Sequence, residues 1–246
     1  MYDPKGNGKD RAVQSVRFTE LEPPKHLRSI VHRFLELKTL EPLEEDYRFH
    51  ALPDACVYIV LDQSRRDVAG ITRLRASSEE LSLGRSFHYI NIRLLPGVWQ
   101  GSPDETGYGM IDSAYAGKLP LVALNRALVA EELPDNLQHL VRFVESLAEG
   151  GLVLANPVTE RIFRHLDDIH SVADMAAVSG VSPRQLQRTL KKTTGFAPHD
   201  FLKVLRLQQS LRGEPSLSYA DQSHFIHSFR KATGYTPAKY AKKFDV

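Results

Sequence analysis

The sequence predicts an α+β protein in which a strand-rich N-terminal part ends in helices and is followed by an all-helical C-terminal part. Up to about residue 115, short apolar runs and alternating residues are typical of strands. After Gly117 the apolar residues recur at helical spacing. A segment of the C-terminal part also occurs twice, which indicates two similar helical units.

Two segments of the N-terminal part are typical of strands. Residues 55–62, ACVYIVLD, form a short β-rich run between turn signals. Residues 87–95, FHYINIRLL, alternate and predict a strand with one buried face. Residues 1–20 are expected to form a loose lead-in. Residues 96–109, rich in glycine, proline and polar residues, are expected to form a loop.

An amphipathic helix is predicted between Pro134 and Gly150, because proline favours a helix start and glycine a helix end. Its apolar stripe consists of Leu137, Leu140, Val141, Val144, Leu147 and Ala148. Such a stripe usually packs on its own domain, and the alternative is that it pairs two chains in a homodimer. Residues 152–157, LVLANP, are the expected hinge between the two parts.

Charge is distributed unevenly along the 246 residues. Residues 156–246 hold 14 lysines and arginines against 8 aspartates and glutamates, whereas residues 1–155 hold 18 against 22. A basic C-terminal part favours a polyanionic partner, or else a solvated basic surface. The single cysteine excludes an internal disulfide framework. With neither a signal-peptide core nor an apolar run of about 20 residues, a cytoplasmic protein without membrane contact is expected.

The repeat joins residues 189–201, TLKKTTGFAPHDF, to residues 228–240, SFRKATGYTPAKY, without gaps. Each copy predicts a helix that ends at a glycine in the left-handed conformation and is followed by a helix with proline in its first turn. The corresponding positions are Ser182 and Asp221, Leu186 and Phe225, Leu190 and Phe229, Gly195 and Gly234, and Pro198 and Pro237. Two similar helical subdomains are therefore expected side by side.

The residues before the first copy complete a helix-turn-helix. Ser171 is expected to cap a short helix, Gly180 to turn the chain, and Ser182 to start a second helix. In this motif the second helix lies in the major groove of DNA. Its outward side chains are Arg184, Gln187, Arg188 and Lys191.

These outward residue types suit base reading. Arginine makes two hydrogen bonds to guanine and glutamine makes two to adenine. Lys191 and Lys192 suit phosphates. In the second copy the outward set is Gln222, Ser223, Ile226, His227 and Arg230, where isoleucine suits a thymine methyl group. The alternative is an ordinary exposed helix face.

Residues 157–243 resemble the DNA-binding half of AraC/XylS-type bacterial transcription regulators, most specifically in SPRQLQR (182–188) and DQSHF (221–225). The resemblance implies two helix-turn-helix units joined by a linker helix at about residues 198–212. It places recognition helices at about 182–193 and 221–232. The DNA-binding residues assigned in this way are Ser182, Arg184, Gln185, Gln187, Arg188, Lys191, Lys192, Gln222, Ser223, Ile226, His227, Arg230 and Lys231.

One departure from the family concerns the second unit. The family places a positioning helix before the second recognition helix, whereas here GEPSLSYA (213–220) precedes it and contains glycine and proline. A truncated second unit is predicted, and the first unit is expected to carry most of the sequence specificity. The N-terminal part resembles cupin-like effector domains through LPDACVYIVLD and INIRLLPGVWQG. This resemblance implies a β-barrel or sandwich that binds a small effector, dimerises, or both.

The sequence is interpreted as a transcription regulator and not an enzyme, with a sensory or dimerisation domain at 1–150 and a DNA-binding domain at 151–246. Expected partners are double-stranded promoter DNA, a small-molecule effector, a second copy and RNA polymerase. One alternative is a cupin-like small-molecule-binding protein or enzyme whose helical tail mediates protein contacts. Another is a DNA-binding protein that dimerises constitutively without ligand control.

No cofactor or metal site is predicted. His224 and His227 are spaced i, i+3, but no suitable third ligand accompanies them. Cys56 lies in an apolar run and is expected to be a buried, inert thiol. Tyr89, Arg93 and Trp99 are open to two interpretations, as effector contacts or as ordinary core and rim residues.

Overall fold

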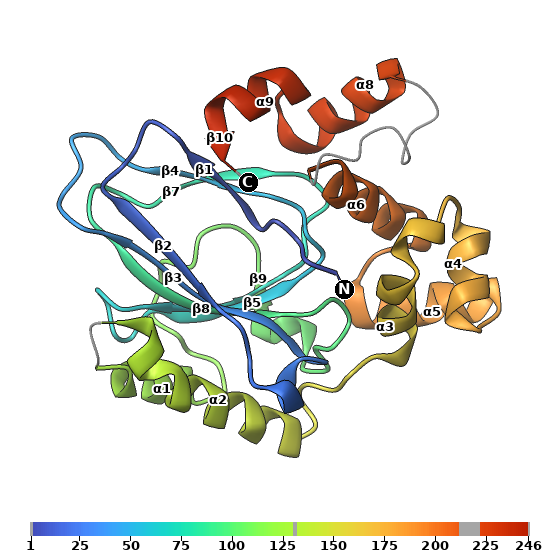
Figure 1. The fold of residues 1–246 in the computed structure, drawn as a ribbon. Helices are drawn as coiled ribbons and strands as arrows, with labels where there is room; N and C mark the ends of the chain where they lie inside the picture. Colours follow the sequence, from blue (N-terminus) through green and yellow to red (C-terminus); the bar gives the residue numbers. More distant parts are fainter. Residues whose placement is uncertain (1, 130–131, 212–221, 246) are drawn as a thin grey trace.

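The computed structural model describes residues 2–129, 132–211 and 222–245, without the side chains of Gln222 and His224. Two β-sheets face each other in the N-terminal part, and helices form most of the remainder (Figure 1). The α+β class predicted from the sequence, with a strand-rich part before a helical part, is therefore confirmed.

The larger sheet has six strands in the order β2-β3-β8-β5-β6-β9, and its strands are antiparallel except for the parallel pair β6 and β9. Their bounds are β2 Val16–Leu21, β3 Val31–Thr39, β5 Val57–Asp62, β6 Ala69–Thr72, β8 His88–Leu94 and β9 Thr106–Gly107. The smaller sheet has the order β10-β1-β4-β7, with β1 Asn7–Asp10, β4 Arg48–Ala51, β7 Glu79–Ser82 and β10 Phe244–Asp245.

The central strand of the larger sheet, β8, differs from its predicted form. Its alternation predicted one buried face, but both faces are largely buried. Ile90, Ile92 and Leu94 join the core beneath α1 and α2. Tyr89 and Arg93 point the other way and line a cavity between the two sheets. A polar second face therefore does not imply an exposed face, because the smaller sheet covers it.

The prediction of a loose lead-in at residues 1–20 is wrong. Tyr2 is 1% exposed and stacks on Phe163 of α3, with ring centroids 4.4 Å apart. Strand β1 pairs with β4 on one side and with β10, from the far end of the chain, on the other. Gly8 permits this approach, because a Cβ there would lie 2.3 Å from the hydroxyl oxygen of Tyr240. These contacts are all long-range, so the local sequence carries little sign of them.

The helices with predicted bounds begin and end close to those positions, whereas no individual prediction covers α1 and α3. Their bounds are α1 Leu121–Ala127, α2 Leu133–Glu149, α3 Pro157–Arg164, α4 Val172–Ser179, α5 Pro183–Thr194, α6 Pro198–Leu211, α8 Gln222–Thr233 and α9 Pro237–Lys243. Short 3-10 turns lie at Lys25–Leu27, Pro103–Glu105 and Leu166–Asp168. The apolar stripe of α2 packs on the larger sheet, within its own domain. Among the described residues, none of the helices is long and apolar enough to cross a bilayer.

Helix α6 links two cores in the C-terminal part. Phe201, Leu202 and Leu205 pack with α3, α4 and α5, whereas Leu207 packs with Phe229 of α8. Figure 1 shows α6 between α8 and α9 on one side and α3, α4 and α5 on the other. The linker helix implied by the family resemblance is thus present over Pro198–Leu211. Arg212 and the shortened segment 213–220 lie outside the described residues.

Candidate nucleic-acid interface

The first helical pair has the predicted helix-turn-helix geometry. The Ser171 hydroxyl accepts a hydrogen bond from the Asp174 N–H and caps α4. Met175 and Ala176 are buried beneath that helix. Gly180 takes the left-handed conformation, with φ of 68°, and turns the chain toward α5. The sequence therefore directs both the start and the end of α4 through residues of the right type.

Helix α5 begins with a capping box. The Ser182 hydroxyl accepts from the Gln185 N–H at 3.3 Å, and the Ser182 N–H donates to the Gln185 side-chain oxygen at 3.0 Å. Together they satisfy two backbone groups at the helix start. Both residues were assigned to DNA, and in the structure they hold the end of the helix that would approach it. Leu186 and Leu190 are fully buried on the inner side.

The outer side of α5 is exposed and basic. Arg184, Gln187 and Arg188 are exposed, and the helix contains no acidic residue. Lys191 and Lys192 follow on the exposed last turn, where the Lys191 ammonium donates to the Gly195 carbonyl at 2.9 Å. The structure therefore brings the first-unit residues predicted to contact DNA onto one accessible helix.

The two copies of the repeat close their helices in the same way. In the first, the Thr194 hydroxyl donates to the Leu190 carbonyl at 2.6 Å and accepts from the Phe196 N–H at 3.2 Å. In the second, the Thr233 hydroxyl donates to the Phe229 carbonyl at 2.8 Å and accepts from the Tyr235 N–H at 3.2 Å. The following glycines have φ of 74° and 79°. The sequence repeat is therefore a repeat of local structure.

The second helix, α8, also presents an exposed face. Ser223, His227 and Arg230 are exposed there, and Ile226 is 39% exposed, which is unusual for a large aliphatic side chain. Lys231 is exposed at its C-terminal end. The expected cap residue Asp221 lies outside the described residues, as does the Gln222 side chain.

The N-terminal part holds the last turn of α8. The Ser78 N–H donates to the Ala232 carbonyl at 2.7 Å. The His50 Nε2–H donates to the Thr233 carbonyl at 3.1 Å. A groove of about 460 Å³ is lined by His227 and Lys231 on one side and by Ser77 on the other. Part of the predicted second DNA-binding face therefore lies beside residues of the sheet-containing part.

Sequence reasoning missed further basic residues on α9. Lys239, Lys242 and Lys243 are exposed on this helix, and the Lys243 Nζ donates to the Tyr235 hydroxyl at 3.2 Å. Their signal is the run KYAKK (239–243), which begins at the end of the second copy of the repeat. Because α9 follows α8 directly, these cations extend the basic surface of the second unit.

Comparisons with known proteins give only distant similarity. No protein-family model matches the chain, and no curated protein matches it. Apo ToxT K231A from Vibrio cholerae strain SCE256 is 11% identical, with a TM-score of 0.42 over 95% of this chain and 99% of its own. A second structure of ToxT from Vibrio cholerae is 10% identical, with a TM-score of 0.43 over 95% of this chain and 100% of its own. Similarity at this level transfers no function to the chain.

Proposed function

We propose that the chain is a sequence-specific DNA-binding transcription regulator of the AraC/XylS type. The observation that carries the proposal is the duplicated helix, each copy with a buried inner side and an exposed face that is free of acidic residues. Two equivalent helices with basic and amide side chains on the outside suit two stretches of major groove. An ordinary solvated helix requires no such duplication.

Within the first unit, base reading falls to Arg184, Gln187 and Arg188. All three are exposed on α5, and none has a hydrogen-bond partner among the described contacts that would have to be broken first. Ser182 and Gln185 stabilise the helix start through the capping box and so fix the position of this end of α5. Lys191 and Lys192 complete the unit with phosphate contacts at its other end.

Within the second unit, Ser223, Ile226 and His227 take the base-reading roles, together with Gln222 as assigned from the sequence. The partly exposed Ile226 is suited to a thymine methyl group. Arg230 and Lys231 supply phosphate contacts, supplemented by the exposed lysines of α9. The charge of this unit supports binding to a polyanion even where no base is read.

The spacing of the two units suits one face of DNA. Helix α6 has 14 residues, so at ~1.5 Å per residue it spans roughly 21 Å. The units add their own width at its two ends (Figure 1). Successive major grooves on one face of DNA lie ~34 Å apart. A rigid α6 would hold α5 and α8 at a separation close to this distance.

Residues 1–150 are proposed as the sensory or dimerisation domain and residues 151–246 as the DNA-binding domain. An effector acts only if it binds two states of the protein with different affinity. The docked state of α8, with His227 and Lys231 beside Ser77, is one such state. Release of this docking is the proposed second state. A second copy and RNA polymerase are the further partners that this role implies.

Retardation of the gene's own upstream DNA, at two salt concentrations, tests the proposal. Binding is expected to weaken steeply with salt, because lysine and arginine displace counterions from phosphates. Arg188→Ala should reduce discrimination between this DNA and a scrambled fragment by roughly tenfold or more. Arg164→Ala, which removes an exposed arginine of α3 outside the helix-turn-helix pair, is the matched control. Equal loss from both substitutions, or undiminished discrimination in Arg188→Ala, contradicts the assignment.

The alternative of a small-molecule-binding protein without DNA contact is favoured by one observation, the cavity between the two sheets. The same retardation experiment separates the two functions. A protein whose helical part serves only protein contacts would show no retardation at either salt concentration.

A further inference from the structure

A groove lies between the last turn of α5 and the N-terminal part. Residues 191–196 form one wall, and the opposite wall includes Arg73, Trp99 and Tyr108. This α5 groove measures about 420 Å³, within the usual range of ~300–1,000 Å³ for small-molecule sites, which often lie between domains. A molecule bound here would contact both parts of the chain at once.

The α5 groove carries positive charge only. Three cations line it, namely Arg73, Lys191 and Lys192, and no acidic residue of the described chain does. By contrast, two other grooves between the N-terminal and helical parts each include a carboxylate, Glu160 in one and Asp200 in the other. A concave site lined by charges of one sign attracts the opposite sign, because their fields add up inside it. The α5 groove therefore suits an anion.

Neighbouring side chains do not neutralise these cations. None of the three forms an ion pair within the part of the chain that the structure describes. Arg73 donates to the Thr106 hydroxyl at 2.9 Å and to the Pro103 carbonyl at 2.8 Å. Lys191 donates to the Gly195 carbonyl at 2.9 Å. All of these acceptors are neutral, so the positive charge of the groove remains uncompensated.

Aromatic rings line the same groove. The Arg73 guanidinium lies 5.3 Å from the ring centroid of Tyr108, whose side chain is 70% exposed. Trp99 is the single tryptophan of the chain, and its Nε1 is buried without a hydrogen-bond partner among the described residues. An exposed ring suits a flat apolar body. The unmet indole N–H adds a donor to the same wall.

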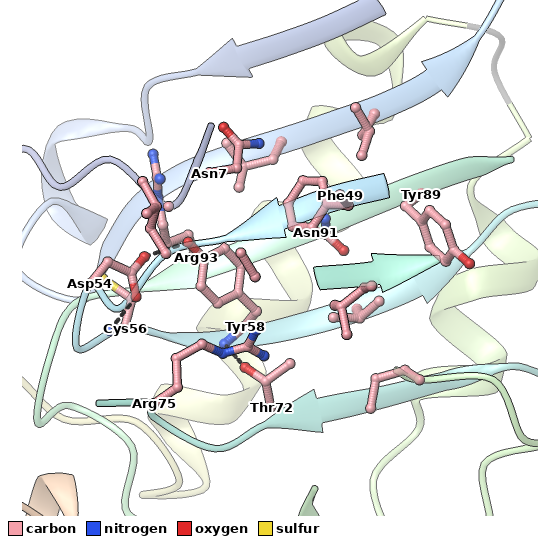
Figure 2. Close-up of a pocket in the computed structure, with 18 of the residues that line it drawn as sticks. Asn7, Phe49, Asp54, Cys56, Tyr58, Thr72, Arg75, Tyr89, Asn91 and Arg93 are labelled. Carbon is pink, nitrogen blue, oxygen red and sulfur yellow. Dashed lines mark hydrogen bonds between the residues drawn. The ribbon is translucent and has the colours of Figure 1, made fainter. Parts of the chain in front are cut away.

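The α5 groove borders the cavity between the two sheets but is distinct from it. Thr72 and Arg73 line both. Figure 2 shows Thr72 among the side chains of that cavity, where the Tyr58 N–H donates to its hydroxyl at 3.0 Å. Trp99, Tyr108 and the lysines of α5 line the groove and not the cavity. Substitutions at these positions therefore test the groove separately.

We propose that the α5 groove binds a small organic phosphate, whose phosphate group pairs with the three cations and whose body lies against the two aromatic rings. A phosphate monoester carries about −1.5 to −2 charges near pH 7 and three acceptor oxygens. This charge matches three cations better than the single charge of a carboxylate does. Arg73 is held by its own hydrogen bonds and so offers a preorganised donor, whereas the lysines reach the ligand from the opposite wall.

A bound phosphate would join the N-terminal part to the first recognition helix. It would occupy Lys191 and Lys192, which the proposed function assigns to phosphates of DNA. The ligand and DNA would then compete for the same cations, so each should lower the affinity for the other by the same factor. This regulatory consequence rests on the proposed function, whereas binding to the groove requires no DNA.

Fluorescence of the single tryptophan tests binding to the full chain, since Trp99 lines the groove. The probes are phenyl phosphate, inorganic phosphate and benzyl alcohol, titrated at constant ionic strength with chloride. Phenyl phosphate should change the emission saturably and bind at least about tenfold more tightly than benzyl alcohol, which lacks the charge. Inorganic phosphate should displace it at higher concentration. Equal affinity for phenyl phosphate and benzyl alcohol, or no binding of phenyl phosphate by fluorescence and calorimetry, overturns the proposal.

Variants locate the bound probe. Lys192→Gln should weaken phenyl phosphate and inorganic phosphate about three- to tenfold, because the lost cation is exposed. Arg73→Gln should weaken both by about tenfold or more. Tyr108→Ala should weaken phenyl phosphate and leave inorganic phosphate unchanged, since it removes only the ring. Arg48→Gln removes an exposed arginine of β4 that does not line the groove and is the matched control, with no change expected.

The exposed positions keep this test independent of folding. Because Lys192 and Tyr108 are exposed, their substitution leaves the core intact even if Arg73→Gln destabilises the N-terminal part. Undiminished binding of phenyl phosphate in Lys192→Gln and Tyr108→Ala overturns the assignment to the α5 groove. Equal weakening by Arg48→Gln would show a general effect of net charge and overturn it as well.

Failure of this proposal and failure of the proposed function are distinguishable. Saturating phenyl phosphate should weaken retardation of DNA about three- to tenfold, whereas chloride at the same ionic strength should not. Phenyl phosphate binding without any retardation would support the groove and reject the DNA-binding role. Retardation without phenyl phosphate binding would do the reverse. Binding of both, with DNA affinity unchanged by phenyl phosphate, would reject the competition at Lys191 and Lys192.

Discussion

The two helix-turn-helix units share their local sequence but not their surroundings. The first unit has a core of its own between α3, α4, α5 and α6, to which the N-terminal part adds the buried side chains of Tyr2 and Ala55. The core of the second consists of Phe229, Tyr240, Phe244 and Leu207, closed by Leu52 from the smaller sheet. Both units therefore contact the N-terminal part, but at different places. The last turn of α5 lines a groove with Thr72 and Trp99, whereas the end of α8 and the helix after it pack directly on the smaller sheet.

Aromatic packing around His50 is the centre of this docking. The His50 ring stacks on Phe244 with centroids 4.9 Å apart and an interplanar angle of 11°. It also makes a T-shaped contact with Tyr235 and a tilted contact with Tyr240. Strand β10, which follows α9, pairs with β1 of the smaller sheet and so adds backbone hydrogen bonds to this docking. The difference teaches that tertiary partners, and not the repeat itself, decide what holds each unit in place.

The largest expected effect comes from Phe244→Ala. Truncation of a buried phenylalanine costs about 3–5 kcal/mol, and here the lost contacts join α9 to the sheet. Amide hydrogen exchange should become faster over residues 222–243 and remain unchanged over residues 183–194. Leu190→Ala is the counterpart and should accelerate exchange in the first unit. Uniform acceleration in both units by Phe244→Ala would show that they unfold together and remove the contrast.

The next effect concerns base reading. Arg188→Ala removes an unhindered guanidinium from α5 and should cost ~1–3 kcal/mol of specific DNA binding, or roughly tenfold to a hundredfold in affinity. Ile226→Ala on α8 should cost less, because a methyl contact is weaker and the second unit is docked. Fluorescence anisotropy with the gene's own upstream DNA measures both. A larger loss from Ile226→Ala would place most of the specificity in the second unit.

The predictable part of this fold rests on short-range signals. The capping residues Ser171 and Ser182, and the turn glycines Gly180 and Gly195, direct chain reversals through their own conformational preferences. The stripe of α2 likewise carries its own period. The four-residue β1 and two-residue β10 carry no such signal, since they form only by pairing across the whole chain.

The residues of the candidate site also divide into those whose position a local pattern predicts and those whose position depends on long-range contacts. Exposure of Arg184, Gln187 and Arg188 followed from helical period alone. The position of His227 and Lys231 beside Ser77 did not, because nothing local links the β-rich part to α8. Arg93 was noted in the sequence as a candidate for effector contact. Its burial depends on the smaller sheet covering β8, which the alternating pattern of that strand does not reveal.

The docking of the second unit is expected to depend on pH, which provides a further test of the difference between the two units. Burial lowers the pKa of His50 below its ordinary value of 6.5, so the folded state favours the neutral ring. The docked state therefore loses stability as the pH falls below about 6.5, where the released ring would be protonated. The nearby charges of Glu80 and Lys243 act in opposite directions on this pKa. Exchange in residues 222–243 should become faster at pH 5 than at pH 7.5, more than exchange in α5.

His50→Gln provides the control for this dependence, since an amide N–H can still donate to the Thr233 carbonyl but does not titrate. The difference in exchange between the two pH values should shrink in this variant. His32 is a separate source of pH dependence, because burial lowers its pKa to about 4. His32 contributes to the pH dependence of exchange in both the unmodified protein and His50→Gln. The difference between the two proteins therefore reports on His50. An undiminished difference would exclude His50 as the titrating group.

The smallest expected effect tests the repeat itself. Thr194→Val and Thr233→Val each remove a hydroxyl that donates to a helix carbonyl and accepts from the N–H two residues later. Each loss should cost about 1 kcal/mol, as measured by urea unfolding of the full chain. Both threonines are buried and share these two hydrogen bonds, so the costs should be similar. The Thr233 hydroxyl has a further acceptor, the Tyr235 carbonyl at 3.1 Å, and its loss should therefore cost slightly more. A markedly larger cost for Thr233→Val would show that docking beside His50 adds to the local bond, since His50 donates to the Thr233 carbonyl.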